Sequence, residues 1–108
     1  MRQEQKKAVK ELSSSLLDEV KDALSITWDD EDKNITSLTE ASIYEINELV
    51  GVELDLEINL SARKMVIQRT RYDYNNALDE FEENYSKPLS RLILNVAIDE
   101  RKKADNGN

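Results

Sequence analysis

The chain has 108 residues, enough for one domain with a modest core, and its 23 acidic and 15 basic side chains give a formal charge of −8. It contains no Cys and no His, which excludes disulfides, thiolate or imidazole metal ligands and His-based catalytic triads. Two Gly residues leave no glycine-rich phosphate loop, no cofactor is expected, and the acid excess argues against a free-standing nucleic-acid binder.

The first periodic segment predicts a helix. Low Gly and Pro with abundant Leu, Glu, Lys and Ala favours an all-α fold throughout. Apolar residues three and four apart form one helical stripe: Val9, Leu12, Leu16, Val20, Ala23 and Leu24. Residues 1–13 are interpreted as an N-terminal extension of the single domain.

A turn around Trp28 is expected to start the second helix. Thr27, Asp29 and Asp30 are good N-caps, and Gly51 suits a left-handed helix end. Trp28 is expected to be buried against the first two helices. The buried face of the second helix should contain Ile35, Leu38, Ser42, Ile46 and Leu49.

The acidic run at 29–32 resembles the start of a calcium-binding loop only in part. Asp29 and Glu40 have the spacing of its first and last ligands, but Lys33 takes a ligand position and Asn34 stands where the loop needs Gly. The run is therefore interpreted as an acidic helix N-terminus without a metal.

Residues 52–60 alternate between apolar and mostly acidic side chains, as in a strand. A single strand finds no partner in a helical chain, so the segment either lies as an extended lid over the helices, which we favour, or pairs with another subunit.

A third helix is predicted from the cap Ser61 to about Tyr85, and a fourth after the turn at 86–88. The third should bury Val66, Ile67, Thr70, Tyr74, Ala77, Leu78, Phe81 and Tyr85. The fourth should bury Leu89, Leu92, Ile93, Val96 and Ala97 and end near Arg101, leaving a flexible tail at 104–108. The predicted fold is a small four-helix bundle, with an extended segment between helices two and three.

Two groups of side chains bear on function. Carboxylate pairs are frequent because acids are frequent, and a small bundle offers no concave, dry setting for acid–base catalysis, so the chain is not expected to be an enzyme. A basic island contains Arg63, Lys64, Arg69 and Arg71. Either it binds nucleic acid with nearby tyrosines, or, as we favour, some of its cations pair with acidic surface of this chain or of a neighbouring copy.

A second stripe on two helices predicts a contact with partners. Met65, Arg69 and Tyr72 fall together on the third helix, opposite its expected core face. On the fourth helix Leu94 and Ile98 lie off the core stripe, with Arg91 beside them. These six residues are predicted to serve assembly and not folding.

Several stretches also carry a family resemblance. They are LLDEVK at 16–21, LSITWDDED at 24–32, GVELD at 51–55, Arg71-Tyr72, and ALDEFEENY at 77–85 before a helix with Leu89 and Leu92. Over residues 14–94 the chain resembles the small head–tail connector (adaptor) proteins of long-tailed bacteriophages.

The resemblance implies a helical structural protein of the virion neck. Such connectors form a ring, typically dodecameric, below the portal protein. The ring extends the channel through which viral DNA passes and docks the next neck, stopper or tail-completion protein. The resemblance implies no cofactor.

The sequence also bears on location and on alternatives. It contains no apolar run of membrane-spanning length and no signal-peptide core near its start, so we expect assembly in the host cytoplasm and no membrane partner. The main alternative is a small acidic regulatory or inhibitor protein that binds a basic host partner. A nucleic-acid module using the basic island is another.

Overall fold

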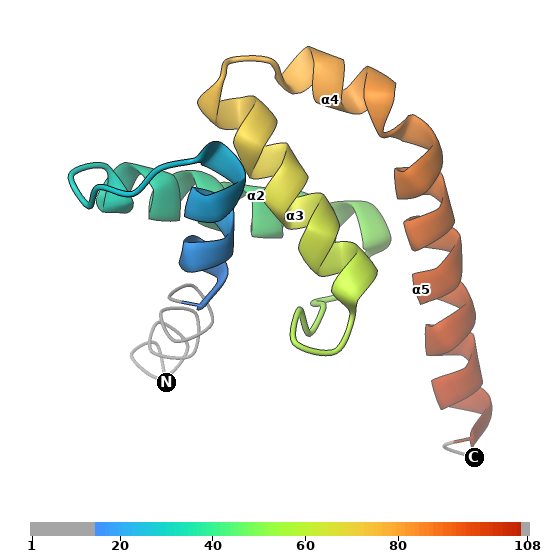
Figure 1. Cartoon of the computed structure of the whole chain (residues 1–108). Coiled ribbons are helices and arrows are strands. Elements are labelled where there is room, and N and C mark those ends of the chain that lie inside the picture. The colour runs from blue at the N-terminus through green and yellow to red at the C-terminus, as the bar shows by residue number, and fades with distance from the viewer. Residues whose placement is uncertain (1–14, 107–108) are drawn as a thin grey trace.

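A computed structural model describes residues 15–106, and all regular structure in that range is helical (Figure 1). Residues 15–24 form an N-terminal helical segment. The helices that follow are α2 (Asp32–Val50), α3 (Leu60–Tyr74), α4 (Leu78–Asn84) and α5 (Ser86–Asn106). The prediction of an all-α chain is confirmed for this range, whereas a four-helix bundle as such is not. Val9 and Leu12 of the first predicted stripe lie outside the described residues.

The ends of α2 follow from local backbone chemistry. Gly51 has a φ of 81°, and its N–H donates to the Asn47 carbonyl at 2.9 Å, so the predicted left-handed end is confirmed. At the other end Glu31 occupies the N-cap position without a side-chain cap hydrogen bond, so none of the predicted caps Thr27, Asp29 and Asp30 is the N-cap. The Asp29 carboxylate instead binds Lys21 of the N-terminal helical segment.

The predicted third helix is two helices. The cap of α3 is Asn59 and not Ser61, since the Asn59 side chain accepts from the Ala62 N–H at 3.0 Å. The chain then breaks after Tyr74. Asn76 adopts a left-handed φ of 57°, and the Ala77 N–H donates to the Tyr72 carbonyl at 2.8 Å. This turn redirects the chain into the short helix α4.

The core lies where the N-terminal helical segment, α2, α3 and α5 meet, and it forms two clusters of buried side chains. One contains Leu16, Ile46, Leu56, Ala62, Met65, Val66, Leu92 and Val96, and the other Val20, Ile26 and Ile35. Of the predicted α2 face, Ile35, Ser42 and Ile46 are buried, whereas Leu49 is exposed. Buried Thr39 and Thr70 donate to carbonyls of their own helices, so these hydroxyls are satisfied locally.

Residues 52–59 form no strand and follow the lid interpretation only in their first half. Leu56 is buried, and Val52 and Leu54 pack against the first core cluster. The alternation then fails, because the chain turns around Asp55, whose carbonyl accepts from Ile58 and Asn59. Ile58 is consequently 80% exposed.

Trp28 is not buried, contrary to the prediction. It is 49% exposed, and its Nε1 donates to Glu31 at 2.9 Å. The turn that carries it runs along the surface, and the apolar anchor of that turn is the smaller, buried Ile26. A large aromatic residue with a polar tip can therefore lie across the surface with its N–H bonded.

Helix α5 is the least enclosed element. Only Leu92 and Val96 are buried on it, Ala97 is exposed against prediction, and the helix runs to Asn106, beyond the expected end near Arg101. Figure 1 shows its C-terminal half extending past the other helices. The described chain is a slab with a smallest dimension of 19 Å, about two helix diameters, so one core cannot cover every face.

Candidate interaction surface

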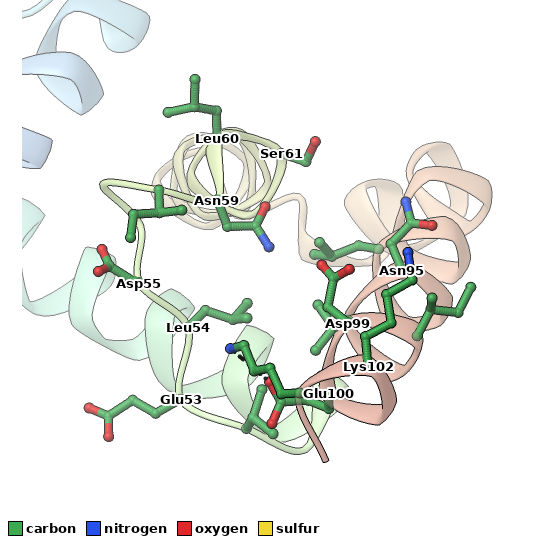
Figure 2. A pocket seen from close by; sticks show the side chains of 16 residues that line it. Glu53, Leu54, Asp55, Asn59, Leu60, Ser61, Asn95, Asp99, Glu100 and Lys102 are labelled. Carbon is green, nitrogen blue, oxygen red and sulfur yellow. Dashed lines mark hydrogen bonds and ion pairs between the residues drawn. The ribbon is translucent and has the colours of Figure 1, made fainter. Parts of the chain in front are cut away.

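An open groove separates α5 from the segment that leads into α3 (Figure 2). Its volume is about 950 Å³, and residues 52–61 form one wall while residues 92–103 of α5 form the other. Leu54, Asn59 and Asp99 point into it, whereas Glu53 and Asp55 point away from α5. Both charge signs occur along the α5 wall, where Lys103 lies 3.2 Å from Glu100. The lining offers apolar contact and charge, without a catalytic arrangement.

One face of α5 carries what we call the α5 stripe: Arg91, Leu94, Ile98 and Arg101, of which Ile98 also lines the groove. At 3.6 residues per turn, the four side chains share one face, nearly opposite buried Leu92 and Val96. Leu94 is 59% and Ile98 42% exposed, and both arginines are exposed. The stripe therefore presents apolar surface flanked by positive charge. This confirms that Arg91, Leu94 and Ile98 lie off the core.

A second exposed surface lies on the opposite wall of the groove, and we call it the acidic loop. It combines two acidic and two apolar residues: Glu53, Asp55, Ile58 and Leu60. Leu60 is 67% exposed and Ile58 more so, and both acids are exposed. The Asp55 carboxylate accepts from the Glu57 N–H at 2.9 Å, which fixes the turn that places Ile58 outside. The strand-like alternation of this segment concealed the surface from sequence reasoning.

The predicted assembly face on α3 does not exist as an exposed surface. Its three residues, Met65, Arg69 and Tyr72, are buried or half-buried within the chain. Met65 is 7% exposed and belongs to the main core cluster. Arg69 is half-buried and donates to the Ser42 hydroxyl on α2 at 3.1 Å. Tyr72 is also half-buried, with its ring edge-on to Phe81 and Tyr85 at 5.7 Å each. Helix α3 is central and packs on several sides, so an assignment based on one buried face fails.

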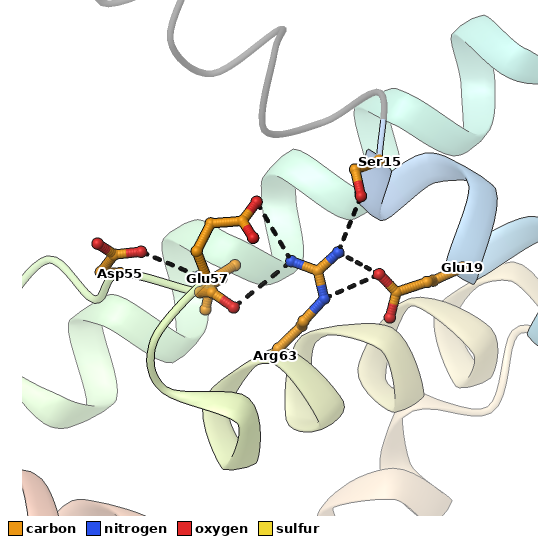
Figure 3. A network of polar contacts seen from close by, with 6 residues as sticks. Ser15, Glu19, Asp55, Glu57 and Arg63 are labelled. Atoms are coloured by element: carbon orange, nitrogen blue, oxygen red, sulfur yellow. Dashed lines mark hydrogen bonds and ion pairs between the residues drawn. The ribbon is translucent and has the colours of Figure 1, made fainter.

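One cation of the basic island, Arg63, pairs with acidic side chains of this chain, as favoured from the sequence for some of these cations. Arg63 is buried, and its guanidinium binds Glu19 through Nε and Nη2 (Figure 3). It also donates to the Ser15 hydroxyl at 3.3 Å and lies 3.9 Å from Glu57. The hydrogen bonds from Arg63 hold the pKa of Glu19 below its ordinary value. This network joins the N-terminal helical segment, residues 56–57 and α3, and sequence reasoning did not identify it.

The acidic run after Trp28 serves the fold. Lys21 Nζ lies 2.8 Å from Asp29 Oδ1 and 2.7 Å from Asp32 Oδ1, and these partners raise the pKa of Lys21. The Glu31 carboxylate accepts a hydrogen bond from the Tyr74 hydroxyl at 2.8 Å, and this bond raises the pKa of Tyr74. Within residues 15–106 no group of acidic side chains is arranged to hold a metal ion. No helix in the same range has the length and apolar character needed to span a membrane.

Comparison of the chain with protein-family models, with curated proteins and with solved structures found no match.

Proposed function

We propose that the chain is a structural subunit of a bacteriophage neck. In this proposal it forms a ring below the portal protein, extends the DNA channel, and presents a surface to the next neck, stopper or tail-completion protein. The observation that carries the proposal is the pair of separate apolar surfaces, the α5 stripe and the acidic loop, on a chain only 19 Å thick. A ring subunit needs two different contact surfaces, whereas a monomer needs neither.

The residues that carry the family resemblance are compatible with this role. Leu16 and Phe81 are buried, and Tyr72 packs against Phe81 and Tyr85. They form the scaffold from which α5 and the acidic loop extend. The resemblance therefore supports a common scaffold, and the exposed surfaces support its use in assembly.

The charge distribution suits a channel through which DNA moves without adhering. Residues 15–85 carry 18 acidic and six basic side chains. Two of these six, Lys21 and Arg63, are buried side chains that form ion pairs with acids of the same chain. A wall with this acid excess repels the phosphate backbone and opposes non-specific binding. The proposed site of action is the head–tail interface of the virion, after assembly in the host cytoplasm.

The test is docking on a portal. We expect the purified chain to sediment as a monomer at low concentration, because each apolar surface is small, and to form rings on portal particles visible by negative-stain electron microscopy. Leu94→Ser should reduce docking while the melting temperature changes little. The matched control is Tyr44→Ser, at a similarly exposed residue of α2 (61% against 59%), and it should dock normally. Failure of the wild-type chain to bind portals contradicts the proposal.

The acid excess favours a second candidate, a small regulatory or inhibitor protein that binds a basic host partner. Such a protein needs its acidic face and has no use for the α5 stripe. It would remain a monomer or dimer with portals present. Salt-sensitive capture of one basic protein, unaffected by Leu94→Ser, would favour this candidate over the connector.

A further inference from the structure

We propose that the α5 stripe of one copy docks on the acidic loop of the next copy, head to tail around the ring. This rests on the proposed function, because it assigns the two subunit contacts that a ring requires. Both surfaces combine exposed apolar side chains with charge, and the charges are of opposite sign. The occupant of each surface is therefore a second copy of this chain.

The apolar parts match in size and character. Leu94 and Ile98 lie one turn apart on α5, and Ile58 and Leu60 are two residues apart at the start of α3. Each pair leaves two branched aliphatic side chains in water within a single copy. Packing one pair against the other removes both from solvent without changing either copy's own core.

Charge selects this pairing over others. Two copies repel through residues 15–85, in which acids outnumber bases three to one, whereas α5 carries five basic and three acidic side chains. Arg91 and Arg101 flank the apolar pair of the stripe, and Glu53 and Asp55 precede the apolar pair of the loop. Contact between two α5 stripes or between two acidic loops would place like charges together. Stripe on loop is the arrangement that pairs opposite charges.

The two surfaces do not satisfy each other within one copy. Glu53 and Asp55 point away from α5, and the groove of about 950 Å³ lies between the loop and the helix (Figure 2). Leu94 and Arg101 lie nearly opposite buried Leu92 and Val96, and Ile98, although it lines the groove, is still 42% exposed. A contact between unlike surfaces of successive copies is heterologous, so it propagates until it closes as a ring.

Charge reversal tests the pairing with the full chain. Arg91→Glu with Arg101→Glu gives a variant whose stripe and loop are both acidic, and Glu53→Lys with Asp55→Lys gives one whose stripe and loop are both basic. Each variant alone should lose ring formation on portals. An equimolar mixture should restore it, because every stripe then meets a loop of opposite charge. The matched control, Asp18→Lys with Asp22→Lys, reverses two exposed acids of the N-terminal helical segment and should assemble normally.

Recovery in the mixture also shows that both variants fold. A loss that mixing does not reverse, in variants whose circular dichroism and melting temperature match those of the wild type, overturns the pairing. Assembly by either variant alone, at the wild-type level, overturns it too.

Cross-linking gives a readout that needs no portal. The chain has no native Cys, so Ser61→Cys beside Leu60, with Ser90→Cys one turn before Leu94, introduces the only two thiols and keeps the apolar contact residues. A short bis-maleimide should convert the concentrated protein into a ladder of oligomers, whereas Ser61→Cys with Tyr44→Cys should not. A product that stops at dimers, or no product, contradicts the contact.

These results separate the two proposals. Wild-type rings on portals without a ladder would refute this contact and leave the neck role intact. A ladder without any portal binding would support the contact and refute the neck role.

Discussion

Replacing Arg63 by Met should destabilise the fold. The substitution keeps the buried aliphatic stem and removes the guanidinium that joins Glu19, the Ser15 hydroxyl and the Leu56 carbonyl. Hydrogen bonds between charged partners contribute about 1.5–3 kcal/mol each. The Glu19 side chain is 46% exposed, so water recovers part of this loss, and we expect a total of about 2 kcal/mol. For a domain of this size that lowers the melting temperature by about 10 °C.

The assay is a double-mutant cycle of Arg63→Met and Glu19→Gln, followed by thermal and urea unfolding. The pKa of Glu19 is lower in the folded chain, so its contribution is complete above the unfolded-state pKa and is lost as pH falls through the folded pKa. The stability gap between wild type and Arg63→Met should therefore be constant near neutral pH and narrow below about pH 4.5. A coupling energy near zero, or a gap independent of pH, would refute this reasoning.

Three further substitutions test two corrected assignments, Met65 and Trp28, and one confirmed assignment, Gly51, each by urea unfolding monitored by circular dichroism. Met65→Ala should lower the free energy of unfolding by about 2–4 kcal/mol, because the side chain is buried in the core; an unchanged stability would show that Met65 is exposed. Trp28→Ala should cost less than about 1 kcal/mol, since half the indole is already in water; a larger loss would mean that it is buried. Gly51→Ala should cost about 1 kcal/mol from its positive φ alone, because nothing lies within 4 Å of the added Cβ; no loss would contradict the left-handed end.

The predictions that held were those in which one local pattern has one physical cause. Helix α2 buries Ile35, Ser42 and Ile46 at the spacing of a single packing face, and it ends where Gly51 permits a left-handed residue. On α5, Leu92 and Val96 are buried and Leu94 is exposed, because that helix is packed on one side only. A helix with a single neighbouring surface obeys the periodicity rule on which the prediction was based.

The predictions that failed concern residues whose surroundings come from distant segments. Helix α3 is contacted from several sides, so Met65 is buried on a face that the periodicity argument assigned to solvent. Arg63 is buried because Glu19, which lies 44 residues earlier, reaches its guanidinium, and no local pattern encodes that pairing. The break after Tyr74 did have a signal in the sequence, since the Asn75-Asn76 pair tolerates the left-handed backbone that ends α3.

The outer half of α5 has an energetic consequence of its own. Residues 97–106 are helical, and every one of their side chains is exposed. A segment of ten residues is too short to be a stable helix in water by itself, so its order depends on propagation from the half anchored by Leu92 and Val96. The affinity of any complex formed through residues 97–106 therefore depends on the free energy of the helix–coil equilibrium of this segment. A substitution of exposed Ala97 that lowers helix propensity should therefore weaken association by reducing preorganisation, in addition to any contact that it removes.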